Sequence, residues 1–162
     1  MKRIRLLLAD DHVMVLDALV GLLGQEFEVA GVARDGGALV EMAQRLGPDV
    51  IVTDVAMPEV NGIDAARILR TENHPAKILF LTMYSDLPLI EEAFRAGASG
   101  YMLKMGGTDE LAKAIQCIVH GGTDPVRNTD QSGLGPHPAE CGSRVMVRWF
   151  FASRLRHAMS GR

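Results

Sequence analysis

Apolar residues along the first 120 positions alternate between two kinds of spacing. Short, nearly continuous apolar runs occur at residues 4–9, 27–33, 50–53, 78–81 and 101–103. Runs of this length are typical of strands buried on both faces. Between the runs, apolar residues recur every three or four positions, as on one face of a helix. The pattern therefore predicts five strands that alternate with five helices.

Local signals support several boundaries of these helices. Asn61 is a good N-cap for the helix whose apolar stripe begins at Ile63, and Pro88 suits the first turn of the next helix. Alternating strands and helices predict an α/β fold, with a parallel sheet covered by helices on both faces. Right-handed crossovers make a doubly wound, five-stranded sheet of flavodoxin-like strand order 2-1-3-4-5 the simplest topology.

Polar side chains stand at the end of four predicted strands. Asp10 and Asp11 follow the first strand, Asp54 follows the third, and Thr82 and Lys104 end the fourth and fifth. In a doubly wound sheet the ligand site lies at the carboxyl ends of the strands, so these groups should converge. Three carboxylates together need a cation, and hard oxygen ligands suit Mg²⁺. The sequence predicts a magnesium site at this edge.

Each of these residues has a plainer explanation when taken alone. An aspartate such as Asp11 often caps a helix or forms a turn, and a lysine after a strand is usually a solvated charge. Tyr101 alone is explained as a half-buried strand aromatic. We expect His12 to be an exposed residue in the first turn of a helix. Capping does not explain the arrangement at four of five strand ends, which favours a functional site.

Composition and charge limit the remaining classes. A chain of 162 residues with 48% hydrophobic content fits one domain with a small appendage. No apolar run approaches the roughly 18 residues that cross a bilayer, and the N-terminal run meets acid too early for a signal peptide. We therefore expect a cytoplasmic protein without membrane contact. Residues 1–121 carry 11 basic and 17 acidic side chains, whereas residues 122–162 carry 6 and 3. An acidic body and a basic tail indicate two segments of different character.

Four stretches together resemble the receiver domain of two-component response regulators. They are LLLADDH, DVIVTDVAMPEVNGIDAAR, KILFLTMYSD and EEAFRAGASGYMLK, and they extend the likeness from Ile4 to about Gly122. Two features are similar to those of the NarL/FixJ branch of this family. Lys104 is not followed by proline, and the last helix ends in VHGGT. The resemblance implies a phosphoacceptor in a His-to-Asp phosphorelay, which is a switch and not a dedicated enzyme.

The resemblance also implies roles for individual residues. Asp54 is the expected phosphoacceptor, and Mg²⁺ is expected on Asp10, Asp11, Asp54 and the backbone carbonyl of Ala56. Lys104 is expected to pair with the phosphoryl oxygens.

Thr82 is expected to bond the attached phosphoryl group, and Tyr101 to swing inward when Thr82 moves. Pro58 and Gly62 are expected to shape the loop after the acceptor.

The resemblance ends abruptly after Thr123. We expect a receiver domain at residues 1–122 and a linker or tail at residues 123–162, with no complete effector domain. We expect the tail to lack the helix-turn-helix that the resemblance to the NarL/FixJ branch implies. Three interpretations of the tail remain open. It is a frameshifted remnant of an effector domain, a short helix that docks on the receiver or a partner, or a segment that contacts membrane or DNA. We rank the last one lowest.

The expected partners are a sensor histidine kinase and a second copy through the face from the fourth to the fifth helix, whereas specific DNA binding is not expected. One alternative is a DNA-binding transcriptional regulator whose output domain is truncated or frameshifted. Another is a phosphatase of the haloacid-dehalogenase type. That enzyme needs a second aspartate two residues after the nucleophile, where this chain has Ala56.

Overall fold

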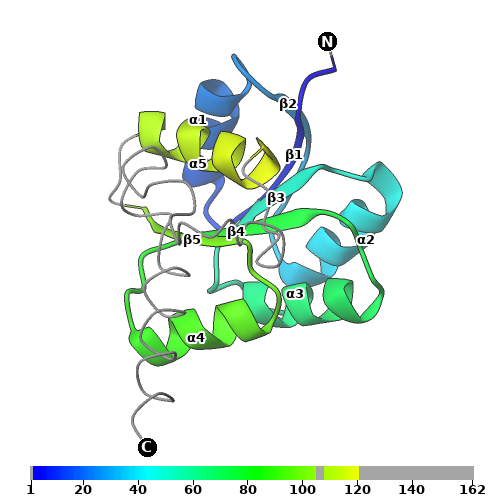
Figure 1. The fold of residues 1–162 in the computed structure, drawn as a ribbon, viewed down its shortest axis with the longest axis vertical. Coiled ribbons are helices and arrows are strands. Elements are labelled where there is room, and N and C mark those ends of the chain that lie inside the picture. The colour runs from blue at the N-terminus through cyan, green and yellow to red at the C-terminus, as the bar shows by residue number, and fades with distance from the viewer. Residues whose placement is uncertain (1, 105–107, 121–162) are drawn as a thin grey trace, which may run out of the picture.

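The computed structural model describes residues 2–104 and 108–120, and the tail predicted at residues 123–162 lies outside them. Within the described residues, strands and helices alternate in the predicted order (Figure 1). The elements are β1 Arg5–Ala9, α1 Val13–Leu23, β2 Glu28–Ala33, α2 Gly36–Leu46, β3 Val50–Thr53, α3 Gly62–Thr71, β4 Lys77–Thr82, α4 Leu87–Arg95, β5 Gly100–Leu103 and α5 Thr108–His120.

The five strands form one parallel sheet in the order β2-β1-β3-β4-β5. Ala9, the last residue of β1, lies opposite Thr53, the last residue of β3. Thr82 at the end of β4 lies opposite Leu103 at the end of β5. The predicted fold class and strand order are therefore confirmed, and the strand ends come to one edge of the sheet.

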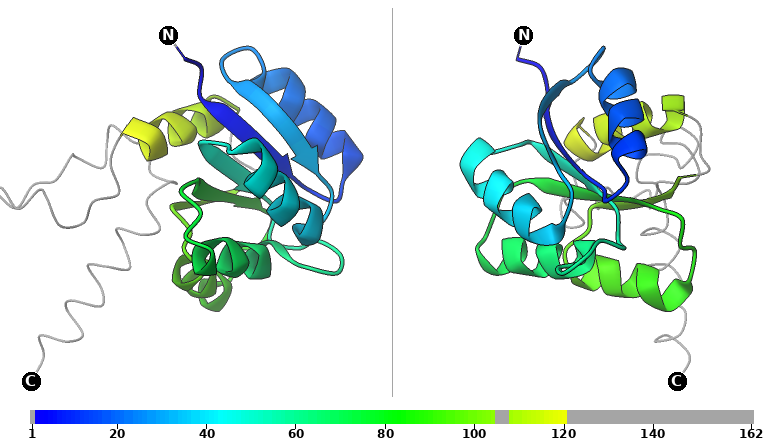
Figure 2. Two further views of the ribbon diagram at one scale, coloured as in Figure 1. Left: turned by 90° about the vertical axis from the view of Figure 1, so that its right-hand side faces the viewer. Right: turned by 180° about the vertical axis from the view of Figure 1, so that it is seen from behind.

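Helices cover both faces of this sheet. Helices α1 and α5 lie on one face and α2, α3 and α4 on the other (Figure 1), and Figure 2 shows the same layers from two further sides. Successive strand residues point to opposite faces: Leu6 and Leu8 pack in the core under α1 and α5, whereas Leu7 packs in the core under α2 to α4. A continuous apolar strand is needed because each face has its own hydrophobic core.

Caps set the helix boundaries where the apolar pattern was less informative. The Asn61 side chain accepts a hydrogen bond from the Asp64 amide, so the predicted cap of α3 is confirmed. Helix α2 begins at Gly36, before its first fully periodic apolar residue, Leu39, because the Asp35 side chain accepts from the Ala38 amide. The apolar pattern marks only the buried face of a helix. It therefore does not locate the start of a helix whose first turn is held by a polar cap.

The described residues contain no helix that is both long enough and apolar enough to cross a membrane.

Candidate functional site

The backbone places the polar residues predicted at the strand ends side by side. Asp54 follows β3, and its amide donates to the carbonyl of Ala9 at the end of β1, with N and O 2.9 Å apart. Asp10 directly follows that alanine. On the other side, the amide of Lys104 donates to the carbonyl of Thr82 at 2.9 Å. These main-chain bonds continue the sheet ladder by one residue and hold the side chains at the carboxyl edge.

Lys104 joins the two buried aspartates. Its Nζ donates to Asp10 Oδ2 at 2.5 Å and to Asp54 Oδ2 at 2.7 Å. Asp10 is 1% exposed and Asp54 is 5% exposed. Burial raises the pKa of Asp10, but hydrogen bonds from Lys104 and His12 outweigh it and lower that pKa below its ordinary value of 3.8. The buried Asp10 carboxylate is stabilised in its ionised form, because the Lys104 ammonium lies against it.

The same carboxylates keep the ammonium charged. Burial lowers the pKa of Lys104, but the hydrogen bonds to Asp10 and Asp54 raise it by more, so that the pKa lies above 10.5. Lys104 is therefore a positive charge at any physiological pH. It is a fixed donor at the edge of the sheet, held there from both sides.

The second oxygen of Asp54 is fixed by the main chain. Oδ1 accepts from the amide of Val55 at 2.7 Å and, more weakly, from the amide of Ala56 at 3.4 Å. At position 56 only the backbone reaches the carboxylate, because alanine has no group that could act as an acid or base. This observation weighs against the phosphatase alternative.

The loop after Asp54 needs glycine where it returns to the strand end. The Gly62 amide donates to the carbonyl of Val55 at 2.9 Å. A Cβ at position 62 would lie 2.0 Å from the carbonyl oxygen of Asp54, well inside van der Waals contact. Gly62 therefore lets α3 start directly against the acceptor strand, as expected for a residue that shapes this loop.

Asp11 and His12 complete the cluster on the solvent side. The Asp11 side chain is 35% exposed, and its Oδ1 lies 2.9 Å from His12 Nδ1. That buried oxygen accepts no hydrogen bond from any described residue, because the imidazole instead donates to Asp10 Oδ1 at 3.0 Å. One ligand atom from each of Asp10, Asp11, His12 and Asp54 lies within 4.8 Å of the others. The donor set fits a divalent cation, and an orphaned carboxylate oxygen is the group that a cation would satisfy.

His12 is exposed, as expected, but it precedes α1 as its N-cap residue and does not lie in the first turn. The imidazole makes no cap bond and contacts the two aspartates instead. The sequence analysis missed this contact. The available signal was the position of His12 directly after the acid pair.

Tyr101 is buried with its ring pointing inward. Its side chain is 1% exposed, and the ring centroid lies 6.2 Å from that of Phe80. The hydroxyl donates to the backbone carbonyl of Tyr84 at 2.7 Å. Burial, with the negative charges of Asp54 and Asp86, raises the pKa of Tyr101 to about 12. The phenol therefore stays a protonated donor and ties the edge strand β5 to the loop before α4.

Thr82 lies at the end of β4, fully buried, where its hydroxyl accepts from the Tyr84 amide at 3.4 Å. Tyr84 thus receives a hydrogen bond from one predicted switch residue, Tyr101, and donates one to the other. The structure brings the predicted residues to one edge, and their roles stay predictions.

Comparisons with known proteins agree with this site. Residues 6–116 match the response regulator receiver domain family. The chain is 37% identical over 123 residues to the transcriptional regulatory protein MctR of Rhizobium johnstonii, covering 75% of this chain and 58% of that protein.

Two solved structures have the same fold. The signal receiver domain of the putative response regulator NarL from Mycobacterium tuberculosis is 27% identical, with a TM-score of 0.73 over 75% of this chain and all of that one. A LuxR-family two-component response regulator from Aurantimonas sp. SI85-9A1 is 33% identical, with a TM-score of 0.70 over 75% of this chain and 87% of that one.

The chain belongs to the response regulator receiver domain family of two-component systems, and its relatives are NarL/LuxR-family response regulators. This family is a signalling domain and not a dedicated enzyme. The chain spans a little over half the length of the curated relatives that it matches.

Proposed function

We propose that this chain accepts a phosphoryl group on Asp54 from a sensor histidine kinase, in a Mg²⁺-dependent phosphorelay. The observation that carries the proposal is the Lys104 ammonium between Asp10 and Asp54, at 2.5 and 2.7 Å. A buried carboxylate is a poor acceptor for a dianionic phosphoryl group unless positive charge offsets the repulsion. Lys104 brings one such charge to the carboxylate that would react.

The acidic cluster would hold the metal ion. Asp10, Asp11 and Asp54 would contribute carboxylate oxygens, directly or through water, and Ala56 would contribute its backbone carbonyl. Bound Mg²⁺ would supply further positive charge for the incoming phosphoryl oxygens. The unpartnered Oδ1 of Asp11 supports this assignment, because it is a buried acceptor that no described residue satisfies.

Thr82 and Tyr101 would carry the signal away from Asp54. The phosphoryl group would add acceptor oxygens near the Thr82 hydroxyl, which accepts a long bond of 3.4 Å from the Tyr84 amide. A shift of Thr82 toward the phosphoryl group would change its contact with Tyr84, the residue that Tyr101 also holds. This is a local electrostatic change acting on one loop before α4.

The surface that responds would run from α4 to α5. Met83, Tyr84 and Leu87 expose apolar side chains where this surface meets the site, which supports contact with a kinase or a second copy there. Other exposed apolar side chains, which the sequence analysis did not single out, are on α1: Val13, Met14, Val20 and Leu22.

Sequence-specific DNA binding is not part of this proposal, because residues 1–121 carry 17 acidic against 11 basic side chains, whereas binding to a groove is favoured by a basic surface. The matched relative MctR is named a transcriptional regulatory protein, and this favours DNA-binding regulation as the second candidate. A titration at physiological salt separates the two, because basic tails bind DNA loosely when salt is low.

The decisive experiment is phosphorylation in solution. The chain is incubated with acetyl phosphate and Mg²⁺, and intact-mass spectrometry should show one added phosphoryl group. Asp54→Asn should show none, and EDTA should abolish the reaction in the wild type. Asp17→Asn, on the exposed face of α1, is the matched control and should react like the wild type. Equal phosphorylation of the wild type and Asp54→Asn would contradict the proposal.

A further inference from the structure

His12 lies close enough to the acid pair to share a metal ion with it. Its Nδ1 is 3.0 Å from Asp10 Oδ1 and 2.9 Å from Asp11 Oδ1. Two ligand atoms at about 2.1 Å from one octahedral ion, with a right angle between them, lie about 3 Å apart. Both distances therefore equal the separation of neighbouring ligands on one ion.

The hydrogen bonds around His12 satisfy Asp10 but leave one oxygen of Asp11 without a donor among the described residues. The imidazole donates to Asp10 Oδ1, but the 2.9 Å approach to Asp11 Oδ1 includes no hydrogen bond, and that oxygen has no donor among the described residues. The His12 side chain is 67% exposed, so water can bond Nε2 when the ring proton moves there. Nδ1 then presents a lone pair beside two carboxylate oxygens.

A nitrogen ligand changes which ions a site prefers. Mg²⁺ takes oxygen ligands and keeps several waters, whereas imidazole suits Ni²⁺, Zn²⁺ and Cu²⁺. We propose that His12 is a specificity-determining ligand that makes the acidic pocket bind divalent transition-metal ions in competition with Mg²⁺. This rests on the proposed function only in taking the same pocket as the metal site.

The proposal also gives His12 a task that its place at the helix end does not explain. His12 is the N-cap residue of α1, yet its side chain makes no cap bond. Substitution by asparagine, a preferred N-cap, should therefore preserve or improve the start of the helix. A loss of metal binding in this variant cannot then be attributed to fraying of α1.

The test is calorimetric titration of the full-length chain with Ni²⁺, in the absence and presence of excess Mg²⁺. Only the part of Ni²⁺ binding that Mg²⁺ displaces belongs to this pocket, which separates it from histidines elsewhere in the chain. His12→Asn should weaken that part by about tenfold or more, while Mg²⁺ affinity stays within about twofold because Mg²⁺ does not need the nitrogen. His120→Asn, at the exposed end of α5, is the matched control and should change neither.

A second measurement identifies the ligand directly. Paramagnetic Ni²⁺ should shift the imidazole resonances of His12 strongly, and Asp11→Asn should diminish this shift. Equal Ni²⁺ affinity in the wild type and His12→Asn, or equal losses of Ni²⁺ and Mg²⁺ affinity, would overturn the proposal. So would Ni²⁺ binding that Mg²⁺ does not displace. Failure of the phosphoacceptor proposal would look different, because Asp54→Asn would then be phosphorylated like the wild type.

Discussion

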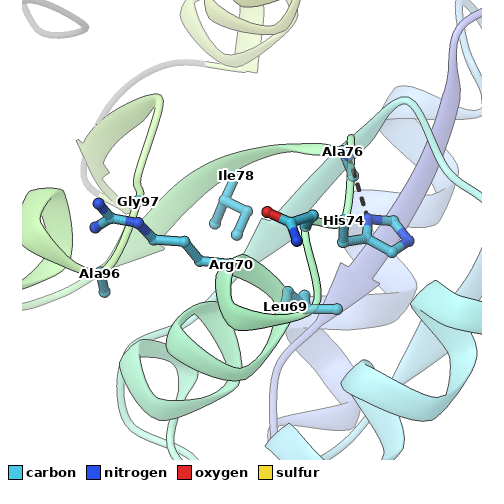
Figure 3. Close-up of a pocket in the computed structure, with 8 residues that line it drawn as sticks. Leu69, Arg70, His74, Ala76, Ile78, Ala96 and Gly97 are labelled. Atoms are coloured by element: carbon cyan, nitrogen blue, oxygen red, sulfur yellow. Dashed lines mark hydrogen bonds between the residues drawn. The ribbon is translucent and has the colours of Figure 1, made fainter.

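Two polar contacts at opposite edges of the sheet, those of Lys104 and His74, have different kinds of partner. At the carboxyl edge, Asp10 and Asp54 share the ammonium of Lys104. At the amino edge, below β4, His74 Nε2 donates to the carbonyl of Ala43 at 2.9 Å, and Nδ1 accepts from the amide of Ala76 at 3.2 Å. Figure 3 shows this second bond in the pocket between α3, β4 and α4.

Arg70, which also lines this pocket, has a backbone partner as well. Arg70 points away from His74 toward Ala96 and Gly97 (Figure 3), and its guanidinium donates to the backbone carbonyl of Arg95. Backbone partners are fixed by the fold. These bonds join the segment after α3 to α2, and α3 to the end of α4, and leave little freedom to respond to a ligand. Side-chain partners can be exchanged, and the carboxyl edge keeps an unsatisfied carboxylate oxygen on Asp11. His74 and Arg70 are thus held by the backbone, whereas Lys104 is shared between two side chains beside an open acceptor.

The largest effect should come from removing the shared ammonium. Lys104→Met leaves Asp10 and Asp54 buried without a counter-charge. We expect the free energy of unfolding at pH 7 to fall by about 2 to 3 kcal/mol. This is at the low end of the losses seen when one partner of a buried ion pair is removed, because the Lys104 side chain is still 13% exposed. Urea denaturation measures this, and added Mg²⁺ should recover part of the loss.

The pH dependence of this stability difference checks the same prediction. The folded-state pKa of Asp10 is below 3.8, so its stabilising contribution is complete above that value and is lost as the pH falls through the folded pKa. The difference between Lys104→Met and the wild type should therefore shrink in acid. Lys113→Met, on the exposed side of α5, is the control. Stability equal to that of the wild type at pH 7 would contradict the assigned role of the ammonium.

A smaller effect, of a different kind, is expected at the amino edge. His74→Ala removes two hydrogen bonds to the backbone of Ala43 and Ala76, and should lower the free energy of unfolding by about 1 to 2 kcal/mol. Phosphorylation by acetyl phosphate should be unchanged, because the contact lies at the opposite edge of the sheet. Parallel thermal melts and mass spectrometry check both parts, with His120→Ala as the control. Loss of phosphorylation in a folded His74→Ala protein would remove the distinction between the edges.

The smallest effect should come from Tyr101, whose hydroxyl bonds the backbone of the loop before α4. Tyr101→Phe keeps the buried ring and loses the hydroxyl bond to the Tyr84 carbonyl, so we expect about 1 kcal/mol less stability. Amide hydrogen exchange in the loop before α4 should become faster, because that loop loses its bond to β5. Tyr84→Phe, whose side chain is 47% exposed, should change neither quantity. Unchanged exchange in Tyr101→Phe would show that the bond does not hold the loop.

The sequence by itself determined the order of elements, the sheet class and the strand ends that carry chemistry. These features follow from local periodicity: a continuous apolar run can only be buried on both faces, and a polar residue that ends it must lie at the edge of the sheet. Asp10, Asp54 and Lys104 were found in this way. The apolar pattern does not mark the start of α2, because the Asp35 cap is a polar contact that lies outside the apolar stripe.

Only the tertiary structure decided which side chains are partners. Lys104 contacts aspartates 94 and 50 residues away in the sequence, His12 turns toward the acid pair instead of capping α1, and the Tyr101 ring lies inward. No period in the sequence encodes these contacts. They depend on the side-chain rotamers chosen when distant strands pack together, and on the need of each buried charge and donor for a partner within reach.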